Sequence, residues 1–361
     1  MTSLARQAGR TMAIRTASTE KELILATRDI FNRPLQDLRI SVTDRCNFRC
    51  VYCMPKEIFG SDYPFLSRRE LLTFEEITRL TRIFADLGVR KLRITGGEPL
   101  VRKDLPDLIE MLAGIDGIDD ITLTTNASLL PRHAQDLVNA GLNRVTVSLD
   151  AIHDDVFKAI NDVDYPVQPV LDGIEAAAQA GLNPVKVNMV VKRGMNEGQI
   201  VPMAEHFRHT PHILRYIEFM DVGNSNGWRL DEVVTAAQIR DALNATWPIE
   251  PLDPNYTGEV ASRYRYRDGA GEIGIISSVS EPFCSTCTRA RLASQGQLFT
   301  CLFGSQGFDL RTPLRDETVS DGDLAEIVQG VWHKRRDRYS EQRTSETAPL
   351  QYKVEMSHIG G

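Results

Sequence analysis

The six cysteines of this 361-residue chain fall into two groups of three, and this grouping indicates metal chemistry. The first triad is Cys46, Cys50 and Cys53, and the second triad is Cys284, Cys287 and Cys301. Each triad is one thiolate short of a closed four-ligand metal site. A metal centre with an open position binds an exchangeable ligand, which is typical of catalytic rather than structural sites. The chain therefore predicts two open sites, each for a small molecule.

The C-x3-C-x2-C spacing of the first triad favours an iron–sulfur cluster over zinc. One tight loop with this spacing provides three thiolates to a [4Fe-4S] cluster and leaves the fourth iron open. A zinc site needs a fourth ligand close by, and none of the seven histidines lies near in the sequence. Zinc remains the less favoured alternative at this point.

The second triad has the spacing C-x2-C-x13-C, whose first half is also typical of zinc ribbons. Two arginines, Arg289 and Arg291, lie just after Cys287. Their planar guanidinium groups suit the binding of an oligophosphate, whereas a role in surface solubility is the simpler interpretation. The local sequence favours an open metal site beside a phosphate-binding site, with a zinc site as the alternative.

Composition and charge indicate an ordinary globular enzyme. With 42% hydrophobic and 25% charged residues, the chain can bury a full core. The formal net charge of −7 argues against general nucleic-acid binding, and no apolar run is long enough to span a membrane. Six cysteines without a secretory signal predict metal or redox chemistry rather than disulfides, and hence a cytoplasmic protein.

Strand and helix patterns alternate from residue 36 onward and must position these motifs. Leu38, Ile40 and Val42 repeat at period two just before Cys46, which places the first triad on the loop after a strand. The alternation predicts an α/β fold, an incomplete (β/α)6 TIM-like barrel whose polar post-strand segments gather at one rim. Further strands are predicted up to Thr95 and over 119–125, 144–149, 184–191 and 213–219, and helices over 130–140, 168–180, 196–208 and 321–338.

Three segments are predicted: an N-terminal extension at 1–35, a partial barrel at 36–235 and a smaller C-terminal domain at 236–361 that carries the second triad. The first part of the extension, 1–19, is arginine-rich and acid-poor, which is typical of organelle transit peptides, but a frayed terminus is favoured. The charged stretch 334–343 is interpreted as a solvated helix face rather than as an RNA-binding surface.

The segment RCNFRCVYCMP at 45–55, together with GGEP at 96–99, resembles the radical S-adenosylmethionine (SAM) enzymes. In that family the open iron of a [4Fe-4S] cluster chelates SAM. The resemblance implies that Tyr52 lies by the adenine and that the glycine-rich turn meets the amino group of SAM. The two glycines permit a close backbone approach, and Glu98 can accept a hydrogen bond from a cation. The implied SAM contacts are Tyr52, Gly97, Ser148 and Met220.

Over residues 36–361 the chain resembles the family of molybdenum cofactor biosynthesis protein A, the GTP 3′,8-cyclases. The resemblance rests on LRISVTDRCNFRCVYCMP, KLRITGGEPL, TVSLDA, RYIEFMDVGN, FCSTCTRARL and the terminal IGG. It implies two [4Fe-4S] clusters and reductive cleavage of SAM at the first. The resulting 5′-deoxyadenosyl radical abstracts the 3′ hydrogen of GTP, and attack on guanine C8 gives 3′,8-cyclo-7,8-dihydroguanosine 5′-triphosphate. The second cluster holds the guanine base.

The same resemblance implies which residues hold GTP. Catalytic roles are implied for Arg289 and Arg291 and for the terminal Gly360 and Gly361, which reach into the active-site region. A triphosphate carries about four negative charges, so its desolvated binding requires a cluster of cations. On the alternative interpretation, some of these cations pair with Asp or Glu instead. The implied GTP contacts are Arg39, Arg93, Thr124, Lys186, Arg289 and Arg291, with Lys91, Thr95 and Arg215 as further candidates.

The family also implies an electron donor, a homodimer and delivery of the product to cyclic pyranopterin monophosphate synthase, with no nucleic-acid or membrane partner. Two alternatives are another radical SAM enzyme with an auxiliary cluster, which usually has more cysteines, and a non-catalytic zinc protein that binds a nucleotide or RNA. Ala127 departs from the family pattern, since glycine is expected after TTN. If that backbone needs a positive φ, the turn must differ slightly.

Overall fold

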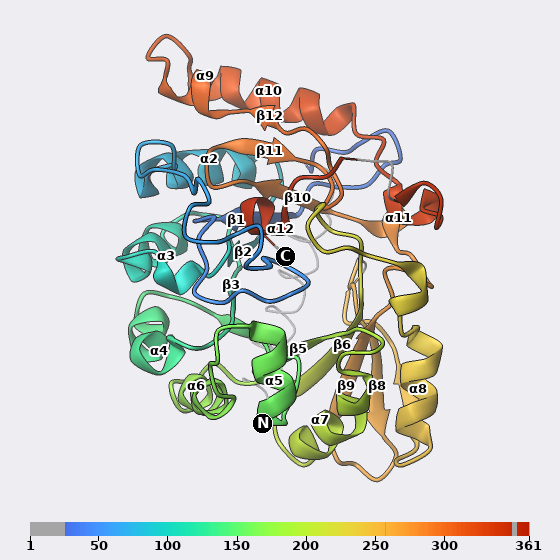
Figure 1. The fold of residues 1–361 in the computed structure, drawn as a ribbon. Coiled ribbons are helices and arrows are strands. Elements are labelled where there is room, and N and C mark those ends of the chain that lie inside the picture. The colour runs from blue at the N-terminus through green and yellow to red at the C-terminus, as the bar shows by residue number, and fades with distance from the viewer. Residues whose placement is uncertain (1–25, 257, 349–351, 361) are drawn as a thin grey trace, which may run out of the picture.

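The computed structural model describes residues 26–256, 258–348 and 352–360, so the segment 1–19 lies outside the described residues. Its centre is a set of six parallel strands that follow one another across the sheet in chain order (Figure 1). This arrangement confirms the predicted incomplete (β/α)6 barrel. The strands are β1 (Asp37–Ser41), β2 (Lys91–Thr95), β3 (Asp120–Thr125), β4 (Arg144–Ser148), β5 (Lys186–Val191) and β6 (Ile213–Glu218).

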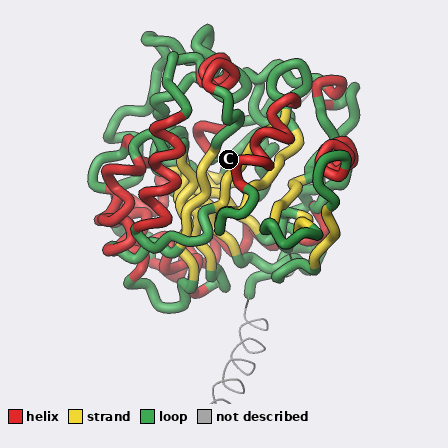
Figure 2. The backbone as a smooth tube through the Cα atoms, turned by 90° about the horizontal axis from the view of Figure 1, so that it is seen from below, coloured by secondary structure: helices red, strands yellow, loops and turns green. Residues whose placement is uncertain are grey.

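Helices cover the outer face of these strands (Figure 2). The first of them begins with a capping box, in which the Thr73 hydroxyl accepts from the amide of Glu76 at 3.2 Å. The sequence-based prediction missed two helices. One begins at Leu105 and has Pro106 in its first turn, and the other begins at Asp154 and has only eight residues. The helices between the strands are α2 (Phe74–Asp86), α3 (Leu105–Ala113), α4 (Leu130–Asn139), α5 (Asp154–Asn161), α6 (Gln168–Gln179) and α7 (Ile200–Phe207).

The C-terminal part of the chain extends the same sheet at both edges. One of its strands pairs in parallel with β1, and another pairs in parallel with β6. The second triad and its arginines are thereby placed directly beside the first strand of the barrel. These strands are β7 (Ile249–Leu252), β8 (Ser262–Tyr266), β9 (Glu272–Ile276), β10 (Arg289–Leu292), β11 (Gln297–Phe299) and β12 (Phe308–Asp309), and the sheet order is β12-β11-β10-β1-β2-β3-β4-β5-β6-β9-β8-β7.

The remaining helices are short, apart from one that packs against the N-terminal segment. Leu35 is fully buried in the main core, and the indole nitrogen of Trp332 donates to the carbonyl of Arg33 at 3.2 Å. Residues 26–35 are therefore tied to the C-terminal part of the chain. The remaining helices are α8 (Ala236–Asn244), α9 (Arg311–Arg315), α10 (Asp321–His333), α11 (Tyr339–Gln342) and α12 (Met356–Ile359), with 3-10 turns at Pro99–Val101, Glu197–Gln199, Leu230–Glu232 and Cys284–Thr286.

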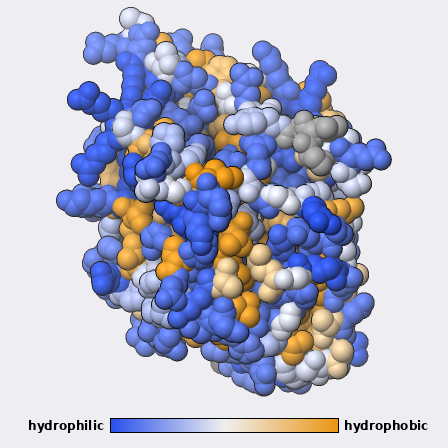
Figure 3. Space-filling model, viewed as in Figure 1, coloured by the Kyte–Doolittle hydropathy of each residue, from blue (hydrophilic) through white to orange (hydrophobic). Residues whose placement is uncertain are grey.

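The surface is mostly hydrophilic, although hydrophobic residues interrupt it in the middle of the face seen in Figure 3. Among the described residues, no helix combines the length and the apolar character needed to cross a membrane. The last described helix, α12, lies over the barrel strands beside β1 (Figure 1). The tail therefore ends at the part of the molecule where the polar post-strand segments meet.

Candidate active site at the barrel rim

The first triad lies on the loop that follows β1, as predicted from the sequence. The amide of Cys53 donates to the carbonyl of Cys50 at 2.9 Å, which closes a tight turn. Burial, followed by the charge of Glu98, raises the pKa of Cys46 to about 12. Burial also raises the pKa of Cys50 and of Cys53, and the charges of the neighbouring triad thiols add to both shifts. The three sulfur atoms are thus close enough to influence one another and need a positive partner to become thiolates.

An iron–sulfur cluster fits this donor set better than a single ion. Among the described residues, no three His, Cys, Asp or Glu side chains converge closely enough for one metal ion. The sulfur of Cys46 accepts a hydrogen bond from the amide of Phe48 at 3.4 Å and a weaker one from the side chain of Asn126 at 3.9 Å. Three thiols spread more widely than one ion requires, with amide donors to the sulfur of Cys46, suit a four-iron cluster.

The glycine-rich turn after β2 packs directly against this cysteine loop. The amide of Gly97 donates to the carbonyl of Thr43, and the amide of Glu98 donates to the carbonyl of Arg45, both at 2.8 Å. A Cβ atom at Gly97 would lie only 2.4 Å from the carbonyl oxygen of Arg45. Glycine is therefore required here for the backbone approach that holds the cysteine loop in place.

Glu98 is held by hydrogen-bond donors from the loops around it. Its side chain is 1% exposed, and its oxygens accept from the hydroxyl of Thr125 at 2.7 Å, the amide of Asn126 at 2.7 Å and the amide of Leu100 at 3.0 Å. This carboxyl group joins the ends of β2 and β3 beneath the first triad. It therefore acts as a positioning group for the loops.

Glu98 is expected to make the stability of the cluster-free chain depend on pH. Burial raises its pKa from 4.5 to about 7, so the folded chain holds this proton more tightly than the unfolded chain. Its contribution is fully present below about pH 4.5 and is lost as the pH rises through 7. Between pH 5 and pH 8, the free energy of unfolding of wild type should fall by roughly 2 kcal/mol more than that of Glu98→Gln. Urea unfolding at both pH values measures this difference, and equal pH dependence in the two proteins would contradict it.

Ala127 adopts a φ of 60°, so the turn after β3 does need a left-handed residue. The side chain is fully buried, and the Ala127 amide donates to the hydroxyl of Thr125 at 3.0 Å. Alanine accepts this conformation at a cost of roughly 1 kcal/mol. The departure from glycine is therefore tolerated without loss of the positive φ.

One cavity of about 240 Å³ brings the sequence-predicted groups together at the rim. It is lined by Tyr52, Ser148 and Met220 from the implied SAM site and by the entire second triad. Gly97 does not line it. Lys186 and Lys91 line an adjoining cavity toward the other end of the strands, and Arg39, Arg93 and Arg289 line both. From the implied GTP site, the first cavity is lined by Arg39, Arg93, Thr124, Arg215, Arg289 and Arg291.

Parallel pairing of β10, β1 and β2 aligns three arginines in one row. Arg39 is the register partner of Arg291 on one side and of Arg93 on the other. Burial, and after it the charge of Arg289, lowers the pKa of Arg291 to about 9. Burial, and after it the charge of Arg93, lowers the pKa of Arg215 to about 9. Such a cluster of buried like charges favours a polyanionic ligand.

These cations are not neutralised by neighbouring carboxylates. Within the described ranges, no ion pair with Asp or Glu is formed by Arg39, Arg93, Lys186, Arg215, Arg289 or Arg291. Arg93 donates instead to the hydroxyl of Thr124 at 3.0 Å, and Arg215 donates to the amide oxygen of Asn188 at 2.9 Å. The alternative interpretation, in which these cations pair with acidic residues, is therefore wrong for this set.

The second triad differs from the first in its charge environment. The sulfur of Cys287 accepts hydrogen bonds from Arg289 at 3.2 Å and from Arg335 at 3.1 Å. Although burial opposes it, the charges of these two arginines lower the pKa of Cys287 to about 6. In contrast, burial and the charge of Asp337 raise the pKa of Cys301 to about 12. Of these two cysteines, Cys287 therefore loses its proton more readily and is the one favoured to bind metal as a thiolate.

Arg335 was missed by the sequence reasoning. The stretch 334–343 was interpreted as a solvated helix face, which is wrong for Arg335, because it is 4% exposed and lines the cavity. Arg343 is also buried, with a side chain that is 3% exposed. The signal in the sequence was weak, since a run of alternating charges with no apolar periodicity is typical of solvent-exposed helices.

The C-terminal tail reaches the arginine row. Arg291 donates through Nη1 to the carbonyl oxygens of Ile359, at 3.4 Å, and of Gly360. Gly360 has a φ of 70°, and a Cβ atom there would lie 2.0 Å from Cγ2 of Thr95. Met356 lines the cavity itself. Gly361 lies outside the described residues.

A buried ion-pair cluster anchors this tail to the loop after β6. Asp221 accepts from Lys353 at 2.7 Å and from Arg343 at 2.6 Å, and its hydrogen-bond partners also include the Tyr339 hydroxyl. Glu355 accepts from the amide of Asn224 at 3.0 Å. Since Met220 directly precedes Asp221, the tail and the implied SAM site are held by one loop.

Replacing Asp221 with asparagine should release the tail. The change leaves two buried cations without their charged partner, which typically costs about 3 to 5 kcal/mol. Hydrogen exchange of amides in residues 352–360 is therefore expected to become faster, whereas exchange in β1 to β6 stays slow. Asp231→Asn is the matched control, because the Asp231 side chain is exposed and its ion pair is with the exposed Arg229. Wild-type exchange of the tail in Asp221→Asn would contradict this role.

Comparison with known proteins places these features in a known family. The model for the radical SAM superfamily matches residues 40–207, and the model described as Molybdenum Cofactor Synthesis C matches residues 212–341. A protein named GTP 3′,8-cyclase from Acidothermus cellulolyticus is 52% identical, over 92% of this chain and 99% of that protein. One of the same name from Staphylococcus haemolyticus is 50% identical, over 94% of this chain and 100% of that protein.

A solved structure of SuiB from Streptococcus suis, bound to S-adenosylmethionine, is similar in fold. It covers 92% of this chain and 74% of its own, with a TM-score of 0.58 and 14% sequence identity. At that identity the likeness supports the architecture alone. Because the match covers 92% of this chain, the similarity in fold extends beyond the partial barrel into the C-terminal region.

Proposed function

This chain belongs to the GTP 3′,8-cyclase family of radical SAM enzymes, and we propose how its described residues divide the work of that reaction. The enzyme is a lyase of molybdenum cofactor biosynthesis that uses SAM and iron–sulfur clusters. In our proposal the first triad holds the cluster that binds SAM. The second triad holds the cluster that binds the guanine base.

The observation that carries the proposal is that residues of the implied SAM site and the second triad line one cavity. Tyr52, Ser148 and Met220 contribute one wall, and the second triad contributes another. A reaction between SAM and GTP requires both molecules within one water-poor space, since proximity replaces a bimolecular encounter. The zinc alternative lacks a site for one ion among the described residues, as noted above.

Cys46, Cys50 and Cys53 would hold the first cluster, which together with SAM would supply the radical chemistry that begins at the 3′ position of GTP and ends at C8 of the guanine. The protein supplies position and charge. Arg39, Arg93 and Arg291, in one row, hold the triphosphate together with Arg289 and Lys186. Gly360 closes the site beside this row because Arg291 holds its carbonyl oxygen.

The hydroxyl of Tyr52 has a specific partner that limits where its ring can lie. It donates to a carboxylate oxygen of Asp150 at 2.6 Å, and the other oxygen accepts from the amide of Val190 at 2.8 Å. Burial raises the pKa of Asp150 to about 6. This bond fixes the Tyr52 ring at the cavity wall, where the proposal places the adenine of SAM.

The proposal extends to the cellular context that the family implies. The enzyme works in the cytoplasm as a homodimer and receives electrons from a separate donor protein. Its product passes to cyclic pyranopterin monophosphate synthase. The net charge of −7 supports the absence of a nucleic-acid partner.

An anaerobic incubation of the reconstituted protein with SAM, a strong reductant and GTP tests this function. The expected result is formation of 5′-deoxyadenosine that depends on GTP, with matching loss of GTP to a cyclised product. Cleavage of SAM without consumption of GTP would reject the assigned substrate. A protein with about two zinc ions and no iron would reject the cluster chemistry altogether.

A further inference from the structure

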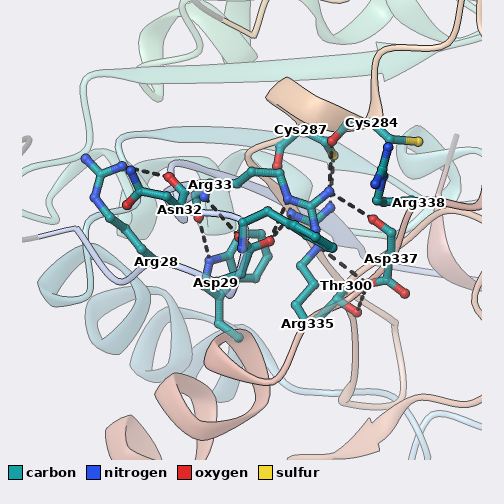
Figure 4. A network of polar contacts seen from close by, with 12 residues as sticks. Arg28, Asp29, Asn32, Arg33, Cys284, Cys287, Thr300, Arg335, Asp337 and Arg338 are labelled. Atoms are coloured by element: carbon teal, nitrogen blue, oxygen red, sulfur yellow. Dashed lines mark hydrogen bonds and ion pairs between the residues drawn. The ribbon is translucent and has the colours of Figure 1, made fainter. Parts of the chain in front are cut away.

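A buried network of charged side chains contacts the loops that carry the second triad (Figure 4). It joins the N-terminal segment 26–35 to the residues that follow α10. The side chain of Asp29 is fully buried, and those of Arg33 and Arg335 are 2% exposed. Burying charges to this degree is costly, so the network needs a ligand or a structural requirement that offsets the cost.

Asp29 is the fixed centre of the network. One of its carboxylate oxygens accepts from Nε of Arg33 at 2.6 Å and lies 3.4 Å from Nη1 of Arg335. The other oxygen accepts from the amides of Phe31 and Arg33, both at 2.9 Å. With both oxygens engaged, Asp29 sets the direction of the two guanidinium groups.

From this centre the two arginines reach the ligand loop. Nη1 of Arg33 donates to the carbonyl of Cys284 at 2.8 Å. Arg335 donates through Nη1 to the carbonyl of Cys287 at 2.8 Å and through Nη2 to its sulfur at 3.1 Å. Figure 4 shows these groups between Asp29 and the two cysteines. The positions of two of the three ligands are thus set by side chains more than 40 residues away in the sequence.

The network contacts the third cysteine, Cys301, indirectly, through the preceding residue Thr300. The hydroxyl of Thr300, which precedes Cys301, donates to Asp337 at 2.6 Å, and the same Asp337 oxygen lies 3.4 Å from Nε of Arg335. The backbone carbonyl of Asp337 also accepts from Arg33 at 2.9 Å. The network therefore touches the loop on both sides of the second triad.

Two guanidinium N–H groups of the network make no hydrogen bond with another described residue, although Nε of Arg335 forms an ion pair with Asp337 at 3.4 Å. Among the described residues, neither Nη2 of Arg33 nor Nε of Arg335 has a hydrogen-bond acceptor, although both atoms are buried. Buried donors of this kind are rare in native structures and indicate a site for a further acceptor. Both side chains line the cavity around the second triad, where the sulfur atoms of a cluster would provide such acceptors.

We infer that Arg33 and Arg335, aligned by Asp29, are positioning residues that hold the second triad and supply positive charge to its cluster. This inference rests on the proposed assignment of that triad to an iron–sulfur cluster. Hydrogen bonds to cluster sulfurs and nearby positive charge raise the reduction potential. The second cluster therefore has a higher potential than it would have without the two arginines.

Redox titration of the reconstituted holoenzyme, followed by its paramagnetic resonance, tests the inference with Arg335→Gln. The component of the second cluster should move to a lower potential, and this cluster should lose iron to a chelator about 10-fold more readily. The component of the first cluster stays unchanged and serves as the internal control. Arg335→Lys should recover part of the potential but not the chelator resistance, because lysine lacks the planar fork that bridges Asp29 and Cys287.

A matched control is Arg208→Gln. Arg208 is also a largely buried arginine with a carboxylate partner, Asp268, but it packs against Trp247 and Tyr266 and does not line the cavity. A folded Arg335→Gln protein whose second cluster keeps the wild-type potential and chelator resistance would overturn the inference. Failure of the wild-type protein to assemble a second cluster or to consume GTP would instead reject the proposed function, so the two failures are distinguishable.

Discussion

Replacing Gly360 with alanine is expected to lower the turnover of GTP by about 100-fold or more, while both clusters remain assembled. The added methyl group would lie 2.0 Å from Cγ2 of Thr95, which is far too short for two carbon atoms that are not bonded to each other. The backbone at φ 70° also disfavours alanine. The tail would therefore move away from Thr95, and Arg291 would lose its hydrogen bond to the carbonyl oxygen of residue 360.

The measurement is the rate of GTP loss under anaerobic conditions, together with the iron content of each protein. Gly330→Ala is the matched control, because Gly330 lies in α10 and an added methyl group there would meet no atom within 4 Å. This control should keep wild-type turnover. Wild-type turnover in Gly360→Ala would show that the tail has no part in the reaction.

Replacing Cys287 with serine is expected to abolish cyclisation while the first cluster still assembles. The iron content should fall from about eight to about four per chain, since a [4Fe-4S] cluster contains four irons. Serine cannot provide the soft thiolate that iron–sulfur clusters require, and it also removes the sulfur that accepts from Arg289 and Arg335. Iron analysis and the rates of GTP loss and of 5′-deoxyadenosine formation measure these effects.

Cys50→Ser provides the reciprocal control. It removes the first cluster, so formation of 5′-deoxyadenosine should stop, whereas the affinity for GTP should stay close to that of wild type. In Cys287→Ser the affinity for GTP should fall, because the guanine base loses its iron ligand. If both variants lost SAM cleavage and GTP binding to the same extent, the division of roles between the triads would be wrong.

The sequence was sufficient to predict the elements that depend on local patterns. The strands β3 to β6 and the helices α4 and α6 begin and end within two residues of the predicted bounds, because period-two and period-3.6 patterns are local. The first triad follows β1 as predicted. Residues that follow a strand in chain order could therefore be placed at one rim without any contact information.

Contacts between distant segments could not be predicted in this way. Arg33 and Cys284 are 251 residues apart, and Arg335 and Asp29 are 306 residues apart. Nothing in the local sequence around these residues indicates that they meet. The parallel pairing of β10 with β1, which aligns Arg291 with Arg39, was hidden for the same reason. The shell around the second triad therefore required the structure.

Glu98 and Gly97 show a different limit of motif reasoning. The motif predicted a close backbone approach at the glycines, which Gly97 makes, and the structure adds that Glu98 joins two strand ends. A motif identifies which residues matter more readily than what each side chain touches.

The most direct test of the shared cavity is the fate of the 3′ hydrogen of GTP. GTP that carries deuterium at the 3′ carbon is incubated anaerobically with the wild-type enzyme, unlabelled SAM and a strong reductant, and the 5′-deoxyadenosine is analysed by mass spectrometry. If the first triad and the second triad hold their ligands face to face, the 5′-deoxyadenosine will contain deuterium. Unlabelled 5′-deoxyadenosine formed alongside consumption of GTP would contradict this account.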